Sequence, residues 1–178
     1  MAPSEVIRSY IERRDHRLMR KVHRWRAPRW IRLWMIYSTR AGDGWLWYLL
    51  GIILLVFGGS DGRQAAGSAA VAAGMGIILF RLLKRLSGRK RPCVLERHCW
   101  AVILPPDQFS FPSGHTITAF AVAISVGLRY PDLMAFLIFC ALSIAASRII
   151  LGMHFLSDVV AGCLMGCALA YASSFLFH

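Results

Sequence analysis

Apolar residues form five runs along the chain, the first four without a charged residue and the last with Asp158 near its start, and charged or turn-forming residues separate these runs. The runs occupy residues 45–59, 65–80, 116–128, 133–147 and about 155–177. Uncharged apolar runs of this kind are typical of membrane-spanning helices. The first run is short for a bilayer, but Trp45, Trp47 and Tyr48 at its start can form an interfacial aromatic belt. The pattern predicts an all-α fold, a polytopic membrane helical bundle with about five transmembrane helices.

The segments between the runs contain the signals for turns and loops. Residues 58–62 read Gly-Gly-Ser-Asp-Gly, and we expect a turn there. We expect residues 81–97 to form a basic loop. Gly162 and Gly166 in the last run are four residues apart, which favours close packing of that helix against a neighbour.

Residues 4–26 have the pattern of an amphipathic helix. Ser4 can serve as its N-cap. Apolar residues recur at helical spacing, and basic residues fill much of the remaining surface. Such a helix is expected to lie on an anionic membrane surface, or alternatively to pack against the protein's own loops. Pro28 ends it, so we divide the chain into a basic amphipathic interfacial region, 1–40, and a transmembrane domain, 41–178.

Composition and charge narrow the class of protein. Hydrophobic residues make up 57% of the 178 residues, and 21 Lys and Arg against 9 Asp and Glu give a net charge of +12. The basic residues are concentrated in 1–40 and 81–97, beside the apolar runs. This is typical of cytoplasmic loops and contact with anionic membrane lipids rather than of a nucleic-acid partner. The cysteines lack zinc-site spacing, and we expect no metal and no cofactor.

The segment 147–158, Ser-Arg-Ile-Ile-Leu-Gly-Met-His-Phe-Leu-Ser-Asp, joins the last two runs and contains ionisable residues. Such residues at the edge of a membrane segment are candidates for function. His154 and Asp158 are four residues apart, so on a helix the carboxylate is within reach of the ring. A carboxylate that accepts a proton from one ring nitrogen leaves the other free to attack an electrophile. Arg148 precedes them across Gly152, which can turn the chain between helices, and its guanidinium suits a phosphate.

Two further clusters of polar residues also lie beside apolar runs. The segment 112–115, Pro-Ser-Gly-His, begins the third run. The unpaired N–H groups of a helix N-terminus favour anions, Gly114 lets the backbone approach a ligand, and His115 can protonate a leaving oxygen. Lys84 and Arg91 provide positive charge. A phosphoryl transition state spreads negative charge over three oxygens, so such donors stabilise it.

These three clusters resemble the signature of the type-2 phosphatidic acid phosphatase superfamily. In words, that signature is Lys, six residues, Arg-Pro; then Pro-Ser-Gly-His; then Ser-Arg, five residues, His, three residues, Asp. The matching residues, in the same order, are Lys84 with Arg91-Pro92, residues 112–115, and Ser147-Arg148 with His154 and Asp158. The match spans residues 84–158 and departs from the signature at no position.

The resemblance implies a metal-independent phosphatase that acts on lipid phosphates. His154 is then expected to attack phosphorus and form a phosphohistidine, with Asp158 orienting and stabilising it. His115 is expected to protonate the leaving group and later to activate water. The remaining residues are expected to hold the phosphoryl oxygens: Lys84, Arg91, Ser113, Gly114 and Arg148.

Other polar residues are assigned simpler roles. Arg81, Arg85, Arg89 and Lys90 are expected to contact headgroups or to set topology, and Asp43, Asp61, Asp107 and Asp132 to be turn residues. The basic N-terminal region is expected inside the cell, and each apolar run is expected to cross the membrane once. The segments after the second and the fourth runs, which contain all three motifs, are then on the cytoplasmic side. Members of the family commonly have six spans, and many have a site that faces outward.

We therefore expect an integral protein of the inner or plasma membrane of a bacterium-like cell. It is expected to hydrolyse a phosphomonoester or diphosphate of a phospholipid or polyprenyl lipid. Two alternatives stay open: a lipid phosphotransferase that uses the same intermediate, and a non-catalytic lipid-binding scaffold. The sequence predicts no particular headgroup, lipid chain or oligomeric state.

Overall fold

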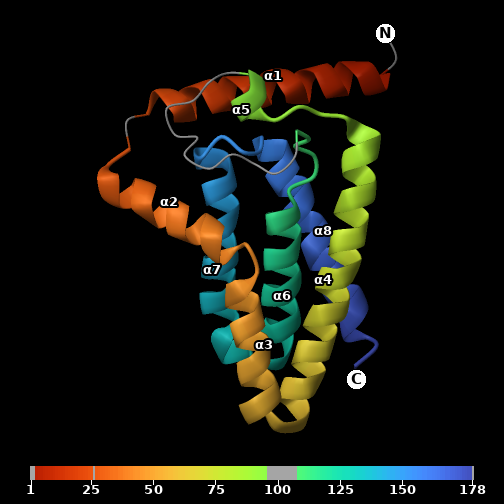
Figure 1. Cartoon of the computed structure of the whole chain (residues 1–178). Helices are drawn as coiled ribbons and strands as arrows, with labels where there is room; N and C mark the ends of the chain where they lie inside the picture. Colours follow the sequence, from red (N-terminus) through yellow and green to blue (C-terminus); the bar gives the residue numbers. More distant parts are fainter. Residues whose placement is uncertain (1–2, 26, 96–107, 178) are drawn as a thin grey trace.

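The computed structural model describes residues 3–25, 27–95 and 108–177, and within these it is a bundle of helices (Figure 1). In this part of the chain one isolated bridge, between Lys90 and Phe109, is the sole β-type pairing. The helices are α1 (Pro3–Arg24), α2 (Arg29–Ala41), α3 (Trp45–Phe57), α4 (Gly59–Ser87), α5 (Pro92–Leu95), α6 (Gly114–Arg129), α7 (Pro131–Ile150) and α8 (Leu156–Ser174).

All five apolar runs are helical, which confirms the predicted all-α membrane bundle. α4, α7 and α8 are each long and apolar enough to cross a membrane, and α2 with α3, bent by 57° at the break between them, form a fourth such segment in the described residues. α6 has 16 residues, about 24 Å of helix, which is less than the thickness of a bilayer core. Its shortness is accommodated because α6 lies inside the bundle: residues 119–127 are all buried.

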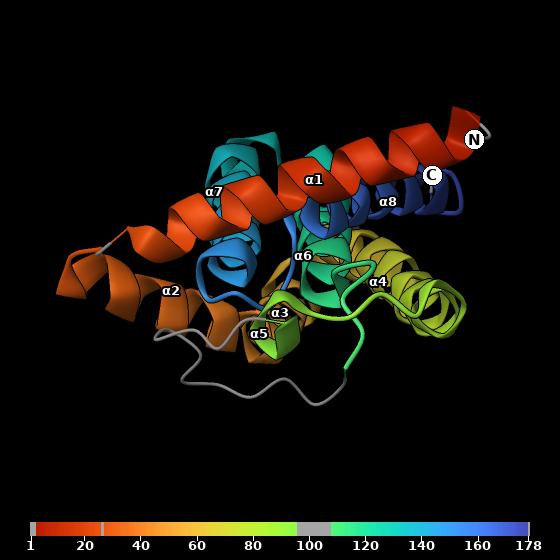
Figure 2. The ribbon, with the colours of Figure 1, turned by 90° about the horizontal axis from the view of Figure 1, so that it is seen from above.

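α6 is the central helix, and α4, α7 and α8 pack around it (Figures 1 and 2). Small residues allow this packing. A Cβ atom on Gly166 of α8 would lie 2.5 Å from the carbonyl oxygen of Ile117 on α6, and one on Gly162 would lie 2.9 Å from that of Ser113. The predicted role of these two glycines in helix packing is therefore confirmed, and they fix α8 against the N-terminus of α6.

α4 differs from the prediction because it is longer at both ends than its apolar run. The expected turn at 58–62 is reduced to Gly58 and Gly59, with Gly59 at a φ of +58°, and the helix begins at once. At the other end the helix continues through residues 81–87, where we expected a loop, and stops at Gly88 in the left-handed region. Lys84 therefore lies on a helix and not in a loop. The Lys and Arg residues of this segment have high helix propensity, which is consistent with the longer helix.

α1 lies across one end of the bundle, nearly perpendicular to the spanning helices, over α7 and α8 (Figures 1 and 2). Asp15 and Met19 face the bundle and are buried, whereas Ile7 and Ile11 are exposed. The helix therefore packs on the protein itself, the alternative left open for it, while part of its apolar surface stays uncovered. The C-terminus lies at the opposite end of the bundle from α1 (Figure 1).

Candidate active site

The three motifs converge at the end of the bundle that α1 crosses, where α4 and α7 finish and α6 and α8 begin. They surround a cavity of about 500 Å³. Six of the eight residues predicted to form the site line this cavity: Lys84, Arg91, Gly114, His115, Arg148 and His154. Segments that are up to 70 residues apart in sequence therefore line one polar chamber. This is necessary if residues of all three motifs are to bind the same ligand.

Ser113 and Asp158 lie behind the wall of the cavity, and both are fully buried. The N–H of Ser113 donates to the carbonyl of Asp158 at 3.2 Å, and its hydroxyl accepts a hydrogen bond from Thr116 at 2.9 Å. In this structure Ser113 does not line the chamber as a phosphate ligand would. It occupies the N-cap position of α6 and joins that helix to α8.

The turn between α7 and α8 presents His154. Gly152 adopts a φ of +71°, as expected of a glycine at a sharp turn. The N–H groups of Met153 and His154 then both donate to the carbonyl of Arg148 at 3.0 Å, which closes the turn. Arg91 fastens it from the other side, because its Nη1 donates to the carbonyl of Met153 at 3.0 Å.

The ring of His154 is held in one tautomer. Its Nδ1 lies 2.7 Å from the carbonyl oxygen of Ser110, an acceptor only, so Nδ1 carries the proton. Nε2 therefore bears the lone pair, and Nη1 of Arg91 lies 3.0 Å from it. Burial lowers the pKa of His154 well below its ordinary value, and the charges of Arg148, Arg91 and Lys84 lower it further. The ring is thus neutral at neutral pH, and the lone pair of Nε2 accepts a hydrogen bond from Arg91.

Asp158 does not fix this tautomer, which corrects the role we derived from its spacing. Its Oδ2 lies 3.8 Å from Nδ1 of His154, too far for a hydrogen bond. Oδ2 instead accepts the N–H of Phe155 at 2.8 Å, at the start of α8. The reason is local: α8 begins at Leu156, so His154 and Asp158 are not on one helix.

Arg148 and Lys84 place two more positive charges at the chamber. Arg148 lies in the last turn of α7, is buried, and donates through Nη1 to the hydroxyl of Thr39 on α2. Lys84 lies in the last turn of α4, with Nζ 5.2 Å from the centroid of the Phe80 ring. With Arg91, they make the chamber strongly attractive to anions.

His115 lies in the first turn of α6, and its partner was not predicted. Its Nε2 is 2.8 Å from Oδ1 of Asp43, in the turn between α2 and α3. Because a carboxylate only accepts, Nε2 carries a proton, and Nδ1 is the nitrogen left for exchange. Asp43 is in a turn as expected, but it also belongs to the site.

The residues that sequence reasoning missed are those that hold the predicted ones. Thr39, Ser110 and Asp43 belong to no motif, and two of them act on residues more than 70 positions away. Asp43 did carry a signal, since it is an acid beside an apolar run. Arg89 was expected to contact headgroups or to set topology; its side chain instead forms ion pairs with Asp15 and Asp158, each at 2.7 Å, which corrects the expected headgroup contact.

The fold and site define a class: membrane helical bundles in which a neutral histidine faces a chamber of fixed positive charges. The comparison with known families agrees. The model of the PAP2 superfamily matches residues 65–178, and the chain belongs to that superfamily, as the three motifs predicted.

Characterised relatives and solved structures give the same family. The chain is 26% identical over 140 residues to an undecaprenyl-diphosphatase of Sulfolobus acidocaldarius, covering 78% of this chain and 67% of that protein. It is 29% identical to a lipid A 1-phosphatase of Rhizobium johnstonii, covering 78% and 65%. The crystal structure of Aquifex aeolicus LpxE matches with a TM-score of 0.74 and 28% identity, over 88% of this chain and 92% of that one. The chain thus spans about two thirds of these curated relatives, which act on phosphorylated lipids by name.

Proposed function

We propose that this protein is a metal-independent phosphatase that hydrolyses a phosphomonoester or diphosphate of a phospholipid or polyprenyl lipid. One observation carries the proposal. Nε2 of His154, with the proton of the ring committed to Ser110, faces a chamber that also holds Arg91, Arg148 and Lys84. A neutral imidazole among fixed cations suits an electrophile that carries several negative oxygens.

The proposed reaction has two steps. In the first, His115 starts as the imidazolium, with its Nε2 proton bonded to Asp43 and a second proton on Nδ1. Nε2 of His154 attacks phosphorus, the bond from phosphorus to the leaving oxygen breaks, and the Nδ1 proton of His115 passes to that oxygen. The arginines and Lys84 hold the phosphoryl oxygens, and Ser110 keeps the Nδ1 proton of His154 in place. In the second, His115 takes a proton from water, the oxygen of that water attacks phosphorus, and inorganic phosphate leaves His154.

The position of the lipid chain is proposed from a groove that continues the chamber. The chamber shares Trp47, Tyr48 and Ala73 with an apolar cavity of about 370 Å³ between α3, α4 and α6. Gly74 also lines the chamber, and a Cβ placed there would meet nothing within 4 Å. We expect Gly74→Trp to raise KM for long-chain lipid phosphates about tenfold and to leave a short soluble phosphate ester unchanged. Leu142→Trp, on the exposed face of α7, is the matched control.

The test of the function is a phosphate-release panel over phospholipid and polyprenyl phosphates, with a chelator present. We expect release from at least one lipid, no loss with chelator, and abolition by His154→Ala. Transfer of phosphate to an acceptor lipid without free phosphate would favour the phosphotransferase. Undiminished release from His154→Ala would exclude the proposed mechanism, and no release from any lipid would favour the scaffold.

We propose that the site faces the cytoplasm. The chamber lies at the end of the bundle that carries α1 and α2 with their many basic residues, whereas Arg63 and Arg129 are at the other end. The test is labelling of intact cells with a membrane-impermeant maleimide after placing cysteine at Arg14 or at Asp61. Labelling at residue 61 and protection at residue 14 are expected, and the reverse pattern would overturn the proposal.

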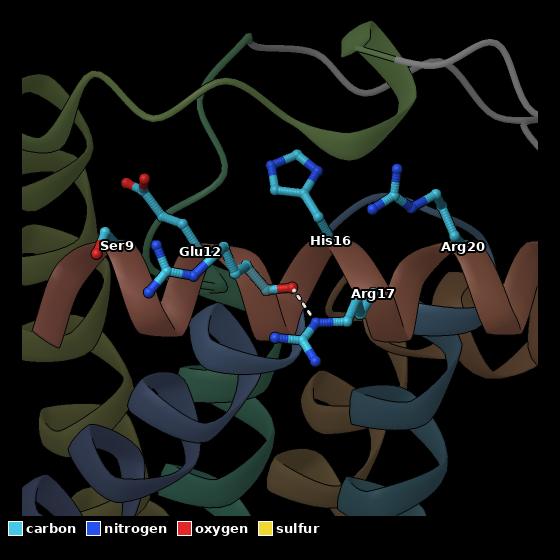
Figure 3. A pocket seen from close by; sticks show the side chains of 6 residues that line it. Ser9, Glu12, His16, Arg17 and Arg20 are labelled. Atoms are coloured by element: carbon cyan, nitrogen blue, oxygen red, sulfur yellow. Dashed lines mark hydrogen bonds between the residues drawn. The ribbon is translucent and has the colours of Figure 1, made fainter. Parts of the chain in front are cut away.

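We also propose that α1 contacts anionic lipids. Its exposed Ile7 and Ile11 line an apolar groove together with residues of α8 such as Val160 and Leu164. Arg13, Arg17 and Arg20 line a second pocket on α1, and Figure 3 shows His16 and Arg20 extending on the side away from the spanning helices. Replacing Arg13, Arg17 and Arg20 by Gln should lower activity on vesicles that contain anionic lipid, and leave activity in neutral detergent unchanged.

A further inference from the structure

Asp15 is a buried acid on the helix that lies across the end of the bundle. It is 5% exposed although α1 is otherwise rich in exposed charges. Its carboxylate accepts the backbone N–H of Ser157 at 3.1 Å, the hydroxyl of Ser157, and Nη2 of Arg89 at 2.7 Å. All of these donors belong to the catalytic end of the bundle, so α1 is attached where α8 begins.

Arg89 connects Asp15 to the motif residue Asp158. While Nη2 bonds Asp15, Nη1 donates to Oδ1 of Asp158 at 2.7 Å and to the hydroxyl of Ser157 at 2.7 Å. Its guanidinium also lies over the ring of Phe155, 4.3 Å from the centroid. Phe155 directly follows His154. The side chain of Arg89 thus fixes both the carboxylate and the aromatic residue that flank the nucleophile.

The backbone of Arg89 supports the nucleophile from the opposite side. The N–H of Ser110 donates to the carbonyl of Arg89 at 2.7 Å. The carbonyl of Ser110 in turn accepts the Nδ1 proton of His154. One residue therefore joins the two groups that set the position of His154, namely the Ser110 carbonyl and the start of α8.

We propose that Asp15 and Arg89 are positioning residues for His154, so that α1 forms part of the support of the active site. This rests on the proposed function. The phosphatase signature contains neither residue, and Asp15 lies outside the residues 65–178 that match the family. Asp15 neutralises and orients Arg89. Arg89 holds Ser110, whose carbonyl bonds the imidazole, and holds Asp158, which fixes the start of α8 beside His154. A displacement of about 1 Å at a nucleophile slows a reaction roughly a hundredfold, so the support affects kcat.

The experiment measures kcat and KM for phosphate release by the full chain in detergent, with the lipid phosphate that the panel identifies. Asp15→Asn and Arg89→Ala are expected to lower kcat roughly ten- to a hundredfold with KM changed less than threefold. Arg89→Lys should restore part of kcat, because it keeps the charge but not the two-sided contact. The double variant Asp15→Asn/Arg89→Ala should be no slower than Arg89→Ala, because both act through one chain of contacts.

Matched controls separate positioning from general loss of charge or fold. Arg85→Ala removes an exposed basic residue near Arg89, and Asp132→Asn an exposed acid at the other end of the bundle; both should keep wild-type kcat. If Arg89→Ala does not fold, the kcat and KM of the isosteric variant Asp15→Asn still test the proposal. Wild-type kcat in Asp15→Asn, or a rise in KM alone, would overturn the proposal. Lack of His154-dependent release by the wild type would instead overturn the proposed function.

Discussion

The two histidines of the chamber, His154 and His115, differ in burial and in the groups that hydrogen-bond to their rings. His154 is 2% exposed, is bonded to a backbone carbonyl and an arginine, and sits in a turn closed by further backbone hydrogen bonds. The side chain of His115 is 29% exposed, and its partner Asp43 is 63% exposed in a turn between two helices. One ring is fixed by the fold, whereas the other is held by a single exposed carboxylate.

This difference matches the two chemical roles proposed for these rings. A nucleophile works best when its lone pair is fixed in direction and its proton cannot move, which a carbonyl acceptor ensures. An acid and base must exchange protons with the leaving group and with water, which requires access to solvent. The comparison therefore teaches that the two rings differ in burial and in hydrogen-bond partner, in the direction that their proposed roles require.

Removing the nucleophile should have the largest effect. We expect His154→Ala to lower kcat by about 10⁴-fold or more, because the variant lacks the imidazole proposed to form the covalent intermediate. Phosphate release from the preferred lipid measures it. His23→Ala, on α1 and outside the chamber, should be near wild type. A His154→Ala variant as active as the His23→Ala control would refute the assignment.

Removing the acid should have a smaller effect that depends on the leaving group. His115→Ala is expected to lower kcat by roughly 10²- to 10⁴-fold on a lipid phosphate, because an alkoxide leaves poorly without a proton. A nitrophenyl phosphate needs no such proton in the first step, so its initial burst of nitrophenol should persist. Loss of the burst would contradict the assignment of His115 as the proton donor, because it would show that the first step needs His115 even when the leaving group needs no proton.

Changing the partner of the acid should be milder still. Asp43→Asn is expected to lower kcat about tenfold on lipid phosphates, because the amide still bonds the ring but no longer stabilises its charge. Asp61→Asn, an exposed acid at the opposite end of the bundle, is the matched control and should be silent. Equal rates for the two variants would show that the bond between Asp43 and His115 has no part in proton transfer.

The smallest expected effect concerns pH. Because burial and the nearby cations lower the pKa of His154, its neutral form is the one present above that pKa. Its ring should therefore stay neutral as pH falls through 6.5, the ordinary histidine value. Nitrogen NMR of histidine-labelled protein, assigned with His154→Ala, should show two well-separated ring resonances at pH 6. Averaging of these resonances with a midpoint near 6.5 would contradict the burial argument.

The sequence predicted the motifs and the helices but not the contacts between them. Periodicity and apolar length identify helices, and motif spacing identifies Lys84, Arg91 and the two histidines. The partners of these residues, such as Thr39, Ser110 and Asp43, are distant in sequence and ordinary in type. Apart from the position of Asp43 beside an apolar run, no local pattern indicates them, because chain packing brings them to the site from a distance.

Two specific errors have the same cause. The spacing of His154 and Asp158 indicated contact only on the assumption that one helix contains both, and the helix begins between them. Arg89 looked like one of several loop cations, but the short pairing of residues 89–91 with 108–110 turns it toward Asp158. Both errors concern the exact residues at which a helix or a pairing begins and ends, and local propensity predicts such boundaries poorly.

The most direct test of the account is to trap the phosphohistidine. The His115→Ala variant is incubated with ³²P-labelled nitrophenyl phosphate and quenched in alkali, where a phosphohistidine survives. We predict label on the chain that is lost in acid and maps to the peptide containing His154, with none on His115→Ala/His154→Ala. Equal labelling of that double variant, or label at another residue, would contradict attack by His154.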